Sequence, residues 1–146
     1  MKGIKLLRKI GEGAHGIVCQ AFDYGQDKII AVKKVTLKNP EKGLSLRLAR
    51  ELNGMAVLSG SKNVISLIKC MTCGPAVWIC MDYCKYNLVS LMPGISKSDG
   101  LVKKLAEMLI NGVRELQDKS ILHGVLYPYF EFYTCEGFVP KKHFDQ

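Results

Sequence analysis

The chain of 146 residues carries a net charge of +8, from 21 Lys and Arg against 13 Asp and Glu, and 48% of its residues are hydrophobic. This composition is typical of a globular domain and excludes a disordered chain. The basic residues are scattered along the sequence, which favours a solvated surface over a nucleic-acid footprint.

The chain shows no signal for export. Its first residues, MKGIKLLRKIGEG, are broken by charge too early for a signal peptide. The longest uncharged run, residues 70–81, is too short to cross a bilayer. We therefore expect an intracellular protein of the cytoplasm or nucleus, without membrane contact.

The hydrophobic pattern predicts an α+β fold with one antiparallel sheet of five strands and one helix in its first part. A stripe formed by Leu44, Leu48, Leu52 and Met55 indicates that helix. In chain order the expected elements are strands at 4–10, 17–22 and 29–35, a helix at 44–58, strands at 64–70 and 77–83, and a second helix at 101–117. Ser98 or Asp99 is the expected N-cap of the second helix.

A glycine-rich loop lies between the first two expected strands. Gly11, Gly13 and Gly16 stand in the pattern GxGxxG, which two kinds of phosphate-binding fold share. A dinucleotide-binding loop runs from a strand into a helix, whereas this loop runs into a second strand. The context therefore favours a glycine hairpin folded over the phosphates of a nucleotide, with glycine letting the backbone amides approach them.

Lys33 follows in the third strand, seventeen residues after Gly16, in the stretch IAVK. We expect its side chain to point beneath the glycine hairpin. A lysine in that position needs a counter-charge, and Glu51 on the following helix is the candidate. A Lys–Glu pair of this kind positions the α- and β-phosphates in protein kinases.

These motifs resemble those of eukaryotic serine/threonine protein kinases, especially the cyclin-dependent kinase branch. KIGEGAHGIV is similar to its glycine loop, IAVKKV to its lysine strand, and SLRLARE (45–51) stands where these kinases carry their cyclin-binding helix. The resemblance implies a kinase-like small lobe over residues 1–84 and the start of a truncated large lobe over 85–146. It also implies a cyclin-like or other protein partner that contacts the helix 44–58, although the first half of SLRLARE departs from the family motif.

The resemblance further implies a nucleotide site, with Met81 as gatekeeper and Asp82, Tyr83 and Cys84 as the hinge that binds adenine. The implied contacts to ATP are Ile10, Gly11, Glu12, Gly13, Gly16, Val18, Ala31, Lys33, Glu51, Met81, Asp82, Tyr83 and Cys84. These residues make their contacts without a metal, so binding of ATP or ADP stays open.

The catalytic part of the resemblance is degenerate. His123, Leu126 and Pro128 keep the frame of the catalytic loop, but the base position holds Val125, the lysine position Tyr127 and a metal-ligand asparagine position Phe130. HFD replaces the motif DFG, so that His143 stands in place of the metal-binding aspartate. Magnesium prefers oxygen ligands, and we expect no magnesium site.

Three interpretations remain open from the sequence. The first is an inactive, kinase-like protein, or pseudokinase, that keeps a nucleotide site. The second is an active serine/threonine kinase with an atypical catalytic loop. The third is a zinc or nucleic-acid binding module that uses Cys70, Cys73, Cys80 and Cys84, although Cys80 lies in an expected buried strand and fits a core position better.

Overall fold

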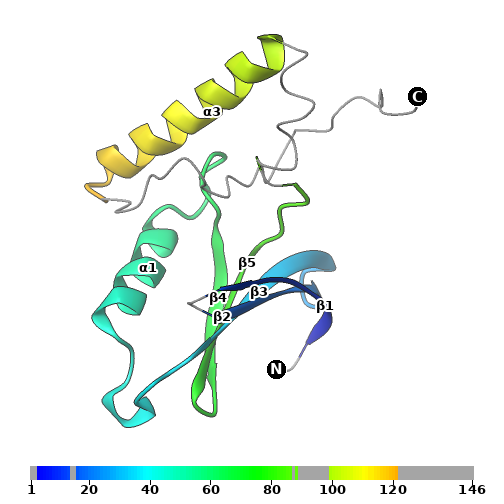
Figure 1. Cartoon of the computed structure of the whole chain (residues 1–146), viewed down its shortest axis with the longest axis vertical. Helices are drawn as coiled ribbons and strands as arrows, with labels where there is room; N and C mark the ends of the chain where they lie inside the picture. Colours follow the sequence, from blue (N-terminus) through cyan, green and yellow to red (C-terminus); the bar gives the residue numbers. More distant parts are fainter. Residues whose placement is uncertain (1–2, 14–15, 87, 89–98, 122–146) are drawn as a thin grey trace.

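The computed structural model describes residues 3–13, 16–86, 88 and 99–121, and its strands form one antiparallel sheet in the order β1-β2-β3-β5-β4 (Figure 1). The strands are β1 (Ile4–Gly13), β2 (Gly16–Asp23), β3 (Lys28–Thr36), β4 (Leu67–Cys73) and β5 (Ala76–Asp82). The helices are η1 (Pro40–Lys42, a 3-10 turn), α1 (Leu46–Val57) and α3 (Asp99–Asp118). The five-stranded antiparallel sheet with a helix between its third and fourth strands confirms the predicted fold class.

The central strand β3 supplies apolar side chains to both faces of the sheet. Ile30 and Val32 are fully buried on one face, where they cluster with Ala21 of β2 and Cys80 of β5. Because successive side chains of a strand point to opposite faces, the residues between them face the other side, which is the side of α1. The buried position of Cys80 agrees with the core role predicted for it.

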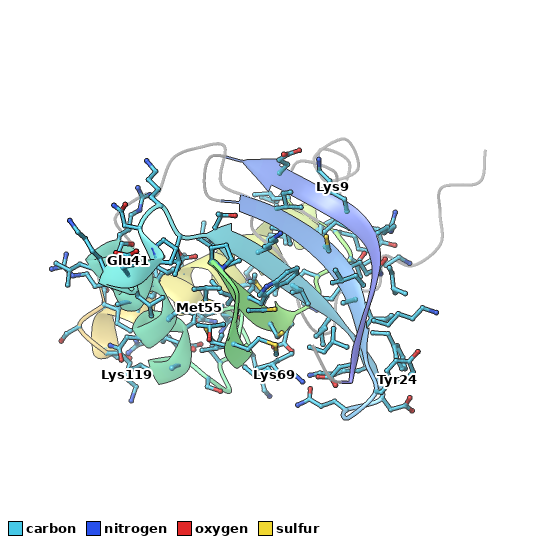
Figure 2. All side chains as sticks on the ribbon, turned by 90° about the horizontal axis from the view of Figure 1, so that it is seen from below. Lys9, Tyr24, Glu41, Met55, Lys69 and Lys119 are labelled. Atoms are coloured by element: carbon cyan, nitrogen blue, oxygen red, sulfur yellow. The ribbon has the colours of Figure 1, made fainter. Side chains whose placement is uncertain are left out.

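Helix α1 packs its apolar stripe on that second face. Leu48 is buried with Val77 and Ile79 of β5, and Met55 adds to the same cluster. Figure 2 shows Met55 between α1 and the strands. The helix begins after Ser45, whose Oγ accepts a hydrogen bond of 3.3 Å from the backbone N–H of Leu48. This contact satisfies one of the free amides at the helix start.

The predicted start of this helix at Leu44 is wrong. Since Ser45 is the N-cap, Leu44 lies outside the helix, and 43% of its surface is exposed. Leu44 fits the spacing of the apolar stripe, but it precedes the N-cap of α1 and does not share the buried face of the helix.

The predicted strand 64–70 is also shifted, because β4 spans Leu67–Cys73. The Oγ of Ser61 accepts hydrogen bonds from the backbone N–H groups of Asn63 and Val64, at 3.0 and 2.9 Å. This turn holds the residues before β4 out of the strand, although Val64 and Ile65 have strand-like side chains. The turn at Gly74-Pro75 joins β4 to β5 as predicted.

Helix α3 packs on the segment between α1 and β4. Gly112 is buried against the backbone of Asn63, and Asn63 Nδ2 donates a hydrogen bond of 2.7 Å to Glu115 Oε1. Beyond the end of α3, a methyl group of Ile121 lies beside Gly54 of α1. Figure 1 shows the same arrangement, with the last turn of α3 near the C-terminal end of α1.

Candidate nucleotide-binding site

A cavity of about 470 Å³ lies under the glycine hairpin, between β1, β2, β3 and the end of β5. Its lining residues are Ile10, Gly11, Glu12, Gly13, Gly16, Val18, Ala31, Lys33, Ile65, Met81, Asp82, Tyr83 and Cys84. The fold thus brings together all the candidate nucleotide contacts except Glu51, from parts of the chain up to 74 residues apart.

The glycine hairpin runs from strand to strand, as the sequence predicts. Gly13 pairs with Gly16 and Gly11 pairs with Val18 across β1 and β2. Gly16 has a φ of 125°, and a Cβ added there would overlap the carbonyl oxygen of Lys34 on β3. Glycine is therefore required at position 16 by the backbone conformation and by the close approach of two strands.

Lys33 forms the predicted ion pair with Glu51. The distance from Lys33 Nζ to Glu51 Oε1 is 2.6 Å, and the two side chains are 19% and 39% exposed. Lys33 stands opposite Val18 on β2 and Ile79 on β5, so the sheet fixes its direction toward α1. The carboxylate thereby holds the ammonium group at the wall of the cavity.

Glu51 itself lines a second, larger cavity of about 840 Å³ beside the first. Gly16 and Lys33 line both cavities, so the second begins where the first ends. Among the candidate contacts, the predicted hinge residues line the smaller cavity, and Glu51 lines the larger one.

The rear of the smaller cavity is apolar. Ala31 and Met81 stand opposite each other on β3 and β5, and Ile65 joins them from the turn before β4. Sequence reasoning missed Ile65 because it placed this residue inside a strand. In the sequence, Ile65 is simply an apolar residue near a strand, and this does not show which way its side chain points.

The residues at and just after the end of β5, the predicted hinge, also line this cavity. The backbone N–H of Asp82 donates to the Ser66 carbonyl at 3.3 Å, and Lys28 Nζ lies 3.3 Å from Asp82 Oδ1. Tyr83 is half-buried and Cys84 is 8% exposed.

The carboxylates of both cavities are already bound by lysines. Glu12 pairs with Lys9, Asp82 pairs with Lys28, and Glu51 pairs with Lys33. These pairs neutralise the carboxylates, and Lys33, which lines both cavities, places its ammonium group beside the apolar rear wall.

The degenerate catalytic positions His123, Val125, Tyr127, Phe130 and His143 lie outside the described residues. Within the described part of the chain, no three His, Cys, Asp or Glu side chains gather closely enough to hold a metal. Cys70 and Cys73 are exposed on β4, whereas Cys80 is buried in β5. Among the described helices, none combines the length and apolar character that a membrane crossing needs.

Comparisons with known proteins agree with this geometry. The family model of the protein kinase domain matches residues 4–126. Cyclin-dependent kinase 11B of Rattus norvegicus is 32% identical over 122 residues, covering 80% of this chain and 28% of that protein. Cyclin-dependent kinase 9 of Danio rerio is 30% identical over 129 residues, covering 80% of this chain and 34% of that protein. The chain spans about a third of the length of these curated relatives. It belongs to the protein kinase domain family, as a relative of the cyclin-dependent kinases.

Proposed function

We propose that this chain is a cyclin-dependent-kinase-like protein that binds ATP between the glycine hairpin and the hinge and does not transfer its phosphate. The observation that carries the proposal is the cavity of about 470 Å³, which unites the glycine hairpin, Lys33 and residues 81–84. The apolar rear wall suits the base, and Lys33 under the hairpin suits the phosphates.

The proposed lack of catalysis rests on residue chemistry. By resemblance, Val125 stands where a kinase keeps its catalytic aspartate, and a valine side chain accepts no proton. Loss of a general base typically costs about 10²–10⁴-fold in rate. Phe130 and His143 stand at the two metal-ligand positions, and neither offers the oxygen atoms that magnesium prefers.

Carboxylates elsewhere in the site do not supply a substitute for those ligands. Glu12, Glu51 and Asp82 are the acidic residues that line the two cavities, and each is paired with a lysine. Within the described residues, these carboxylates belong to no group of three His, Cys, Asp or Glu side chains that could hold a metal ion. The residues present do not fit magnesium, and we assign it no role.

A phosphoryl-transfer assay separates this proposal from an active kinase with an atypical loop. The purified chain is incubated with γ-labelled ATP, magnesium and a general kinase substrate, beside Lys33→Met. The proposal expects both proteins to give the same background label. Transfer above background by the wild type that disappears in Lys33→Met would establish the active alternative.

We also propose a protein partner, cyclin-like or of another kind, on the outer face of α1. The relatives' names describe kinases that depend on cyclins. Leu46 is 76% exposed at the start of α1, and Val57 is 44% exposed at its end. These two exposed aliphatic side chains are the apolar contacts that we assign to such a partner. Leu46→Glu should abolish binding of a purified cyclin in a titration, whereas Lys119→Glu should not.

A further inference from the structure

The larger cavity has a charge pattern that the nucleotide contacts do not explain. It lies between the end of β3, the loop that contains η1, and the first turn of α1. Lys38, Lys42 and Arg47 line it, together with the shared residues Gly16 and Lys33. The cavity therefore continues from the glycine hairpin into a basic wall.

In the part of the chain that the structure describes, the three additional cations have no acidic partner. Within the described residues, Lys38, Lys42 and Arg47 form no ion pair, and the single acidic residue of this cavity, Glu51, is held by Lys33. Glu41 lies on the same loop, as Figure 2 shows, but it is not among the lining residues. The cavity wall thus carries an excess of three positive charges, which attracts a polyanion.

The start of α1 adds to this positive potential. Ser45 and Arg47 line the cavity, and the first turn of the helix contains no acidic residue. The free N–H groups at a helix N-terminus carry partial positive charge that favours anions. This contribution acts in the same direction as the three basic side chains.

We propose that the larger cavity receives the phosphate chain of the nucleotide, and that Lys38, Lys42 and Arg47 neutralise it in place of a metal. This inference rests on the proposed ATP site, because Gly16 and Lys33 connect the two cavities. The smaller cavity then selects the base, and the larger one selects the number of phosphates. The three basic side chains supply the positive charge that a magnesium ion would otherwise bring to the phosphates. They do not hold the phosphates in the geometry that phosphoryl transfer needs.

The test measures the affinities of adenosine, ADP and ATP by calorimetry in the presence of EDTA. The variant is Lys38→Gln/Lys42→Gln/Arg47→Gln. Its matched control is Lys103→Gln/Arg114→Gln/Lys119→Gln, which removes the same three charges from exposed residues of α3 and its end. In the wild type and the control, affinity should rise from adenosine to ADP to ATP. In the cavity variant, ATP affinity should fall by at least about tenfold while adenosine affinity stays unchanged.

Tripolyphosphate supplies a second readout. It should compete with ATP for the wild-type protein and leave adenosine binding unaffected. Two results would overturn the inference and leave the base site intact. One is that adenosine, ADP and ATP bind with the same affinity, and the other is that the cavity variant keeps the full ATP affinity of the wild type. Absence of binding by adenosine and ATP alike would overturn both the inference and the proposed function.

Discussion

Lys33 Nζ lies 2.6 Å from Glu51 Oε1, so that a carboxylate on α1 holds a cation on the central strand of the sheet. This contact connects the sheet to the helix at the point where the two cavities meet. The position of Lys33 therefore depends on α1 being docked.

Glu51→Gln should weaken ATP binding, because Lys33 loses the group that fixes its position. We expect calorimetry to show a severalfold lower affinity. The free energy of unfolding should change by less than about 1 kcal/mol, since ion pairs near the surface contribute little. Glu41→Gln makes the same charge change on the exposed loop and should leave ATP affinity as it is. Equal affinities of the two variants would refute a positioning role for Glu51.

Gly16→Ala should destabilise the fold. The added Cβ would overlap the Lys34 carbonyl, and alanine disfavours a φ of 125°. We expect the free energy of unfolding, measured by urea denaturation, to fall by about 1–3 kcal/mol. Gly13→Ala is the matched control, because a Cβ at Gly13 meets no atom within 4 Å. If both alanine variants unfold at the same urea concentration, the close approach of β2 to β3 is not as described.

Asn63→Ala should loosen the packing of α3. Asn63 donates to Glu115 at 2.7 Å, and hydrogen bonds from Ser61 and Asn63 lower the pKa of Glu115 below its usual value of 4.5. Loss of a hydrogen bond to a charged group should cost about 1.5–3 kcal/mol at neutral pH. Asn53→Ala, on the exposed face of α1, should cost much less.

The cost of Asn63→Ala should also depend on pH. Because folding lowers the pKa of Glu115, its stabilisation is complete above the unfolded value and is lost as pH falls through the folded value. The difference in the free energy of unfolding between wild type and Asn63→Ala should therefore stay constant from neutral pH down to 4.5 and shrink as the pH falls further. A difference that stays constant below that pH as well would exclude the charged form of Glu115 as the acceptor.

Asp23→Asn should make the free energy of unfolding depend less on pH in the acid range. Asp23 is 1% exposed, and Lys69 Nζ donates to its Oδ2 at 2.7 Å from β4. This bond, and a second from the backbone N–H of Gly25, lower the pKa of Asp23 below 3.8. Wild type should be the more stable protein above that pH, and the difference should fade as pH drops below it. Asp27→Asn, at an exposed position of the same hairpin, should follow the wild-type profile.

Residues in regular strands are the part of the site that sequence patterns predict well. Alternation along β3 puts Ala31 and Lys33 on one face of the sheet. The resemblance to the kinase glycine loop adds Val18, which stands opposite Lys33 on β2 in the structure. The Lys33–Glu51 pair follows because a cation that faces the helix requires a counter-charge, and Glu51 is next to the apolar stripe of α1.

Contacts made by turns and by polar side chains are not predictable in this way. Ile65 lines the cavity from a turn that Ser61 creates through its hydroxyl group. The bond between Asn63 and Glu115 joins residues 52 positions apart, and neither has a spacing that indicates the other. The basic wall also escapes prediction, because Lys38, Lys42 and Arg47 come together only when the loop folds against α1.

The most direct test of the account is a thermal-shift titration of the wild-type chain and Lys33→Met with ATP, once in EDTA and once in magnesium. Ligand that binds only the native state raises the melting temperature as its concentration exceeds the dissociation constant. We predict that ATP stabilises the wild type in EDTA at least as well as in magnesium, and that Lys33→Met shows little shift in either. Stabilisation that appears only with magnesium, or that persists in Lys33→Met, would contradict a metal-independent nucleotide site centred on Lys33.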